Sequence, residues 1–233
     1  MQRNPAQLKK SVRSTRAAIA RSIRVVPIDG DGTKPDFCDA CWRLLRRLDI
    51  FLGGRSEQWR SDGRQKLKVM VLWRYNQLDP FKGTKPRFEN IEVPGLSFHR
   101  AKGLEANYTI LLDVSEGDYG VPSQIEDDEL LNLVMPRPET FEYAEERRLF
   151  YVALTRASRG VFLLTNAREP SRYIREHSEI AGDDLRFETV DGELLRQCPA
   201  CRAGHLVDRT GPSNRRFLGG SQFPNCEHTA PLK

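Results

Sequence analysis

Short apolar runs alternate along this chain with segments whose apolar side chains recur at helical spacing. The apolar runs, which predict strands, occupy residues 68–73, 108–114 and 160–165. The segments that predict helices occupy residues 36–52, residues 142–154 and a stretch that begins at residue 170. Strands that alternate with helices indicate a parallel sheet covered by helices. The sequence therefore predicts an α/β fold.

The composition is that of a globular chain with a heavily charged surface. Of the 233 residues, 39% are hydrophobic and 30% are charged, which suits one domain of moderate size with a small appendage. No run approaches the roughly 18 apolar residues that a membrane span needs. The amino terminus has no apolar segment of the secretory type. We expect a cytoplasmic protein with no membrane partner.

Basic residues gather at both ends of the chain. Residues 1–24 contain seven lysines and arginines and no acid, and residues 196–233 contain six basic residues against two acids. Two basic ends suit contact with a polyanion, and a solvated basic surface is the alternative that charge alone leaves open.

The five cysteines form two close pairs, Cys38/Cys41 and Cys198/Cys201, with Cys226 left over. An odd number in an intracellular chain argues against a disulfide framework and favours metal binding for at least one group. The first pair lies in an amphipathic helical segment with no partner pair nearby, so these cysteines are expected to be packing residues.

Two longer runs carry most of the functional information. They are SFHRAKGLE at residues 97–105 and EERRLFYVALTRA at residues 145–157, and each precedes an apolar run. Together they resemble motifs V and VI of superfamily 1 helicases of the UvrD/Rep type. The runs RNPAQLKK, VLWRYN, GDYGVPS and EDDELL, which begin at residues 3, 71, 117 and 126, resemble the helicase IV branch of that family.

This resemblance implies both fold and organisation. In that family two RecA-like domains clamp one ATP, and residues 1–190 correspond to the second motor domain, a RecA-like parallel sheet covered by helices. A composition break near residues 192–197 separates it from a small module at residues 196–233.

The resemblance also implies roles at the nucleotide. Arg156 matches the arginine finger, whose guanidinium stabilises charge on the γ-phosphate in the transition state. Glu105 matches the acid that accepts hydrogen bonds from the nucleotide sugar. Gly103 would let the backbone approach the nucleotide.

DNA contact is the role implied for three further residues, His99, Arg74 and Asn76. A lone histidine would more often be a satisfied core residue, and only the surrounding motif favours a DNA role for His99. Inside the second motif, structural roles are expected: Arg147 and Arg148 pair with the glutamates that begin the same helix, and Phe150 and Tyr151 pack in the core.

No Walker A loop is present, although a helicase of this class needs one to cradle the phosphates. Pro27 and the glycines that follow it indicate a loop, and GDGTK at residues 30–34 has the wrong spacing with no strand leading cleanly into it. The acidic DDE at residues 127–129 is expected to be a loop. The chain is therefore expected to hold half of an ATP site, to need an upstream helicase domain with the Walker A loop, and not to hydrolyse ATP alone.

The module at the carboxyl end begins with CPACRAGHLV at residue 198 and continues with RRFLGGSQFPNC at residues 215–226. It resembles the four-cysteine zinc finger at the end of type I DNA topoisomerases. Cys198, Cys201 and Cys226 are the candidate zinc ligands, but Gly220 stands where the family has another cysteine. His205 or His228 could complete the site, and a degenerate, metal-free knuckle remains the alternative. Aromatic and basic side chains in the module suit contact with a single strand: Phe217, Phe223, Arg215 and Arg216.

The sequence thus predicts the carboxy-terminal half of an ATP-dependent 3'-5' DNA helicase, with ATP and Mg²⁺ as cofactors of the assembled motor, zinc in the small module, and single-stranded or partly duplex DNA as the partner. The alternative is a non-catalytic nucleic-acid-binding protein derived from a helicase, and a third possibility is a truncated gene product. The DNA structure, the pathway and the oligomeric state are left open.

Overall fold

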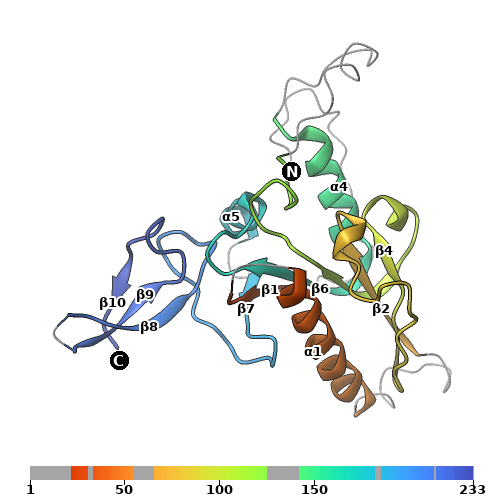
Figure 1. Cartoon of the computed structure of the whole chain (residues 1–233), viewed down its shortest axis with the longest axis horizontal. Helices are drawn as coiled ribbons and strands as arrows, with labels where there is room; N and C mark the ends of the chain where they lie inside the picture. Colours follow the sequence, from red (N-terminus) through yellow and green to blue (C-terminus); the bar gives the residue numbers. More distant parts are fainter. Residues whose placement is uncertain are drawn as a thin grey trace.

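A parallel β-sheet forms the centre of the molecule (Figure 1). The computed structural model describes residues 22–30, 34–54, 66–124, 142–181, 185–212 and 214–232. The basic segment before residue 22 and the acidic run at residues 126–131 lie outside these residues, and so does the expected loop at 127–129. The sheet confirms the predicted α/β class.

The strands lie in the order β3-β2-β5-β6-β1-β7, and β4 also pairs with β2. Within the described residues every pair in this sheet is parallel. The strands are β1 (Ile23–Ile28), β2 (Leu67–Trp73), β3 (Ile91–Glu92), β4 (Gly95–Ser97), β5 (Ala106–Leu111), β6 (Ala157–Asn166) and β7 (Leu185–Phe187). Two short 3-10 helices, η1 (Asn76–Leu78) and η2 (His99–Ala101), follow β2 and β4.

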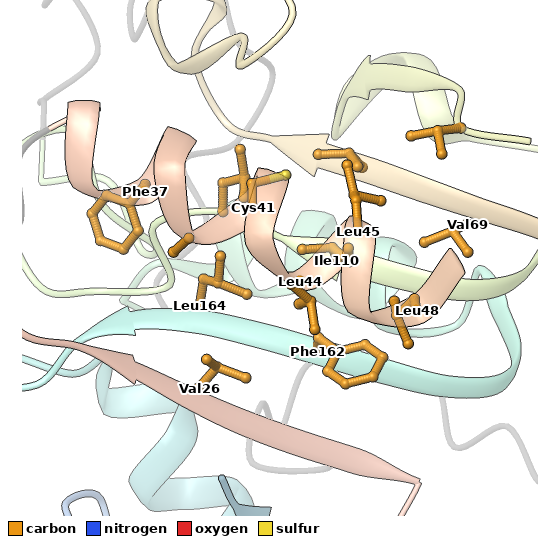
Figure 2. Close-up of a cluster of buried hydrophobic side chains, with 14 of the residues drawn as sticks. Val26, Phe37, Cys41, Leu44, Leu45, Leu48, Val69, Ile110, Phe162 and Leu164 are labelled. Carbon is orange, nitrogen blue, oxygen red and sulfur yellow. The ribbon is translucent and has the colours of Figure 1, made fainter. Parts of the chain in front are cut away.

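Helix α1 (Lys34–Gly53) covers one face of the sheet. Its side chains pack on Val26, Ile110 and Phe162 of the strands beneath (Figure 2). The buried positions of the helix recur three or four residues apart: Phe37, Ala40, Cys41, Leu44, Leu45, Leu48 and Leu52. Burying a large apolar side chain contributes roughly 1.5–3 kcal/mol. The predicted packing role of Cys41 is confirmed, because this side chain is fully buried.

Helices α4 (Ala144–Leu154) and α5 (Arg172–Ala181) cover the other face. Phe150 of α4 lies against Tyr173 of α5 with ring centroids 5.1 Å apart, which confirms the core position of Phe150. Tyr151 is 41% exposed, so the expectation that it packs in the core is wrong. Adjacent residues of a helix point about 100° apart, and only one of these two rings can face the sheet.

An ion pair joins the two helices on this face. Nη2 of Arg147 donates to Oε1 of Glu176 at 3.1 Å, and its guanidinium lies 4.7 Å from the ring centroid of Tyr173. Pairing within α4 is the expectation from the sequence, whereas the ion pair found links Arg147 to α5. Arg147 therefore fixes α5 on α4, which keeps its predicted structural role but changes its partner.

Strand β1 corrects the prediction of a loop around Pro27. Pro27 lies inside β1, which ends at Ile28, two residues before Gly30. A strand therefore does end just before the GDGTK run, contrary to the expectation, and residues 31–33 of that run lie outside the described residues. Proline is tolerated here because β7 pairs only with residues 23–25 of β1, so on that side position 27 needs no ladder hydrogen bond.

The cysteine module is a separate small sheet of antiparallel strands, β8 (Leu206–Thr210), β9 (Arg216–Gly220) and β10 (Thr229–Ala230). It lies beside α5 at one end of the molecule (Figure 1). Nε2 of Gln197 donates to Oγ of Ser178 on α5 at 2.9 Å, and Ala203 packs into the core of the α5 face. None of the helices in the described residues is both long and apolar enough to span a membrane.

We expect the α1 core to dominate stability. Leu44→Ala removes a fully buried side chain and should lower the free energy of unfolding by about 2–5 kcal/mol. Ile50→Ala on the same helix is the matched control, because Ile50 is 76% exposed and its truncation should change stability by less than about 0.5 kcal/mol. Urea denaturation followed by circular dichroism measures both, and equal losses would contradict the assigned core.

Candidate functional site

The residues expected at the nucleotide lie together at the amino edge of the sheet. Gly103 and Glu105 directly precede β5, and Arg156 directly precedes β6. Because β5 and β6 are parallel neighbours, their amino ends share one edge. The Ala106 N–H donates to the Arg156 carbonyl at 2.9 Å and ties the two segments together.

The guanidinium of Arg156 is held between the end of α4 and the segment before β5. Its Nε donates to the Val152 carbonyl at 2.9 Å, and its Nη1 donates to the Leu104 carbonyl at 3.2 Å. A guanidinium has five N–H donors, so this arrangement leaves donors for an anionic ligand. The Leu104 contact places the arginine directly beside the residue that precedes Glu105.

Gly103 and Glu105 are both exposed at this edge. Gly103 has a φ of +82°, a conformation that disfavours a side chain, and no atom lies within 4 Å of where a Cβ would stand. The backbone there is open to a ligand, and the Glu105 carboxylate is accessible to hydroxyl donors.

The residues expected at DNA lie at the opposite, carboxyl edge. Arg74 and Asn76 follow β2, and His99 follows β4, which is paired in parallel with β2. Asn76 and His99 are exposed. A strand of six residues such as β5 spans ~20 Å, which separates the two sets of residues.

Arg74 is engaged by Glu146 of α4. Nε of Arg74 donates to Oε1 of Glu146 at 3.0 Å and Nη2 donates to the same oxygen at 2.6 Å. Burial lowers the pKa of Arg74, but the hydrogen bond and charge of Glu146 outweigh burial and raise it above the ordinary value. The pair fixes the orientation of Arg74, and its remaining N–H groups are the part available to a phosphate.

A pair of aromatic rings at this edge was not anticipated from the sequence. Tyr75 and Tyr119 meet edge to face with centroids 5.5 Å apart, and Tyr119 is 52% exposed. The Tyr75 hydroxyl lies 2.6 Å from Oγ of Ser123, which positions the ring. Both tyrosines lie within the quoted helicase IV-like runs, which was the available signal, but only the fold brings positions 75 and 119 together.

Asp113 is a second residue that the sequence did not single out. It lies just beyond the carboxyl end of β5 with a φ of +53°. Burial raises the pKa of its carboxyl to about 6, although a hydrogen bond with Ser115 lowers it in part. Its only sequence signal was its place at the end of an apolar run.

The three candidate metal ligands of the cysteine module come together. The Sγ atoms of Cys198, Cys201 and Cys226 all lie within 4.8 Å of one another, and those of Cys198 and Cys226 are 3.8 Å apart. Zinc–sulfur bonds of about 2.3 Å in a tetrahedron separate the sulfurs by about 3.8 Å, so the spacing fits zinc. It is far longer than a disulfide bond of about 2.05 Å.

Neither histidine candidate joins this group within the described residues. His205 is buried, and Nδ1 of its ring has no hydrogen-bond partner. Burial lowers the pKa of His205, and the charge of Asp29 only partly offsets this effect. His228 donates its backbone N–H to the Cys226 thiol rather than its ring.

Family comparisons match both parts of the chain. Residues 65–168 match the model of the UvrD-like helicase C-terminal domain, and residues 195–233 match that of the topoisomerase DNA binding C4 zinc finger.

Individual relatives agree with this division. DNA helicase IV of Escherichia coli (strain K12) is 30% identical over 176 residues, which are 75% of this chain and 23% of that protein. The ATP-dependent DNA helicase PcrA of Leuconostoc citreum is 36% identical over 93 residues, 36% of this chain and 11% of that protein. DNA topoisomerase 1 of Archaeoglobus fulgidus is 39% identical over 49 residues, 21% of this chain and 7% of that protein. The chain thus spans less than a quarter of each of these relatives.

Asp113 should make stability depend on pH. Its pKa of about 6 in the folded chain exceeds the ordinary value of 3.8, so between about pH 4 and pH 6 the folded chain binds more protons than the unfolded chain. The stability that this carboxyl contributes is present below about pH 4 and is lost as the pH rises through 6. The rise in pKa corresponds to at most about 3 kcal/mol.

Asp113→Asn should therefore raise the free energy of unfolding at pH 7.5 by about 1–3 kcal/mol and flatten its change between pH 4 and pH 7. Asparagine tolerates the positive φ of this position. Asp118→Asn, which removes an exposed carboxylate nearby, controls for the loss of a charge as such. Urea unfolding over this pH range measures the effect, and a variant with the slope of the unaltered chain would refute a raised pKa.

Proposed function

We propose that this chain, which carries a UvrD-like helicase C-terminal domain at residues 65–168 and a topoisomerase-type zinc ribbon at residues 195–233, is the second motor half of an ATP-dependent 3'-5' DNA helicase. It is homologous to the carboxy-terminal parts of DNA helicase IV and PcrA. In this proposal residues 1–190 form the motor domain and residues 196–233 the DNA-binding ribbon. A separate domain with a Walker A loop supplies the phosphate cradle and binds Mg²⁺.

The contact between Arg156 and Leu104 carries the proposal. It puts the guanidinium next to Glu105 at one edge of the sheet, so one nucleotide can meet both. Arg156 then stabilises the charge that spreads over the γ-phosphate oxygens in the transition state. Glu105 accepts hydrogen bonds from the ribose hydroxyls, and Gly103 leaves room for the nucleotide beside the backbone. Because the arginine reaches across a domain cleft, hydrolysis depends on closure.

One segment links the nucleotide edge to the DNA edge. Residues 98–105 cross the sheet on the face covered by α4. His99 lies near the carboxyl edge and Glu105 lies at the amino edge. Phe98 and Ala101 in this segment are fully buried, so it moves with the core rather than as a loose loop. When the domains close on ATP at the amino edge, this segment moves His99, Asn76 and Arg74 at the carboxyl edge, where single-stranded DNA binds.

The zinc ribbon adds a second DNA contact. Phe223 is 56% exposed, and the guanidinium of Arg209 lies 5.4 Å from its ring centroid. Arg215 and Arg216 are exposed on the same module. An exposed aromatic ring with a guanidinium against it suits stacking and phosphate contact with a single strand. Cys198, Cys201 and Cys226 would hold zinc, which supplies the cross-link that fixes so small a fold.

ATP hydrolysis tests the motor role. The full chain is assayed alone and mixed with a separately produced Walker A domain from a homologous helicase, each with and without single-stranded DNA. The chain alone should show no turnover, and the mixture should show DNA-stimulated turnover. Arg156→Ala should lower kcat of the mixture by about 10³- to 10⁵-fold, because an arginine finger contributes that much.

Arg168→Ala is the matched control, since Arg168 is an exposed arginine just beyond the other end of β6. It should leave kcat close to that of the unaltered chain. Turnover by the chain alone that is lost in Arg156→Ala would mean that this chain has its own phosphate cradle. DNA binding without turnover in any mixture would favour a non-catalytic nucleic-acid-binding protein.

The ribbon's DNA contact has its own test. Phe223→Ala should weaken binding of a labelled single strand by about 5- to 150-fold at fixed salt, which corresponds to about 1–3 kcal/mol for one stacked base. Leu232→Ala controls for loss of exposed apolar surface, because Leu232 is 40% exposed in the same module. Fluorescence anisotropy measures both affinities, and equal values for the two variants would exclude stacking on Phe223.

A further inference from the structure

The zinc ribbon of this chain offers one thiol fewer than a closed zinc site needs. Structural zinc sites have four protein ligands, and sites with three keep an open position for water or another small ligand. Here three thiols gather from two turns, one carrying Cys198 and Cys201 and the other carrying Cys226. The identity of the fourth ligand therefore decides what kind of site this is.

Gly220, the last residue of β9, stands at the vacant corner of the cluster. A Cβ built on this glycine would lie 3.4 Å from Sγ of Cys226 and 3.2 Å from the Cys226 carbonyl oxygen. A cysteine here would thus direct its sulfur into the cluster with a shift of only a few tenths of an ångström. Glycine leaves that corner with no ligand atom.

The rest of the chain does not fill this position within the described residues. All five cysteines and all four histidines are described, and Cys38 and Cys41 belong to α1. Among the residues with assigned positions, no histidine or carboxylate joins the three thiols. A fourth ligand from the protein is therefore missing at the place where the fold would present it.

The cluster borders a cleft that opens to solvent between α5 and the ribbon. This cleft of about 480 Å³ is lined by two of the candidate ligands, Cys201 and Cys226, together with Arg175, Glu179, Ala200, Arg202 and Asn225. A small molecule can therefore approach the sulfurs from outside.

We propose that Cys198, Cys201 and Cys226 bind one zinc ion through three thiolates, and that the fourth position is an exchangeable site that water occupies and a small thiol can enter. On entry the thiol releases its proton to solvent, its sulfur bonds to zinc and the water leaves. The proposal concerns the module alone and does not depend on the motor function.

X-ray absorption of the zinc-loaded full chain tests the ligand count. One zinc per chain with three sulfurs at about 2.3 Å and one oxygen at about 2.0 Å is the expected result. Four sulfurs without added thiol, or no retained zinc, would overturn it. So would a histidine contribution that disappears in His205→Ala or His228→Ala.

Gly220→Cys should close the site. The fitted number of sulfurs rises to four, and zinc affinity in a chelator competition rises by about 10-fold or more, the equivalent of at least about 1.4 kcal/mol. Gly211→Cys is the matched control, because it adds a thiol to the same module where the nearest atom to its Cβ is the Arg215 carbonyl oxygen at 3.6 Å. Equal affinities for the two variants would contradict the position assigned to the fourth ligand.

Thiol titration of the cobalt-substituted chain tests exchange, and its decisive readout comes from the unaltered chain. Added β-mercaptoethanol should change the visible absorption bands of the unaltered chain in a saturable way and leave those of Gly220→Cys unchanged. A spectrum of the unaltered chain that does not respond would overturn the exchangeable site. None of these measurements involves ATP or DNA, so a failed ATPase test and a failed metal test are distinguishable.

Discussion

A parallel sheet must be covered on both faces, and the rest of this structure depends on that requirement. Its strands are apolar on both sides: β2 is buried continuously from Val69 to Trp73. Helix α1 closes one face, and α4 and α5 close the other. Because both faces are filled by helices, the residues expected at the nucleotide and at DNA lie at the edges of the sheet, where strands begin and end.

The direction of the strands then decides at which edge of the sheet each candidate site residue lies. Arg156 and Glu105 precede strands and lie at the amino edge, whereas Arg74 and His99 follow strands and lie at the carboxyl edge. In open α/β sheets ligands usually bind at the carboxyl ends of the strands. An arginine at the amino edge suits a domain that completes a nucleotide site built on another domain. Because the two edges lie far apart, the segment at residues 98–105, which spans the sheet between them, is the structural link between the two sets of residues.

The cysteine module is too small to have a hydrophobic core of its own. Its buried apolar cluster contains only Cys198, Leu206 and Cys226 among the described residues, with a few half-buried neighbours. So little buried surface does not stabilise a fold alone, and a metal cross-link is the usual remedy. Two of the three buried members are themselves metal ligand candidates, so zinc bound there would stabilise the fold of this module. Glycine at position 220 leaves the path of the chain unchanged, because β9 keeps its register with β8 up to this residue, so its effect would fall on the chemistry of a bound metal.

Periodicity and motif spacing in the sequence were enough to identify α1, α4, α5 and strands β2, β5 and β6, since local spacing of apolar residues decides which face of a helix or strand is buried. Resemblance to a helicase family, rather than periodicity, singled out the two motifs around Glu105 and Arg156, and a resemblance to a zinc finger singled out the three cysteines. They did not reveal β1, because Pro27 argues against a strand until one knows that β7 stops short of it. Side-chain partners were also beyond local signals: Glu146 meets Arg74 across 72 positions and Glu176 meets Arg147 across 29. Only the packing of helices on the sheet brings such residues together, and only the fold shows that Gly220 lies beside the Cys226 thiol.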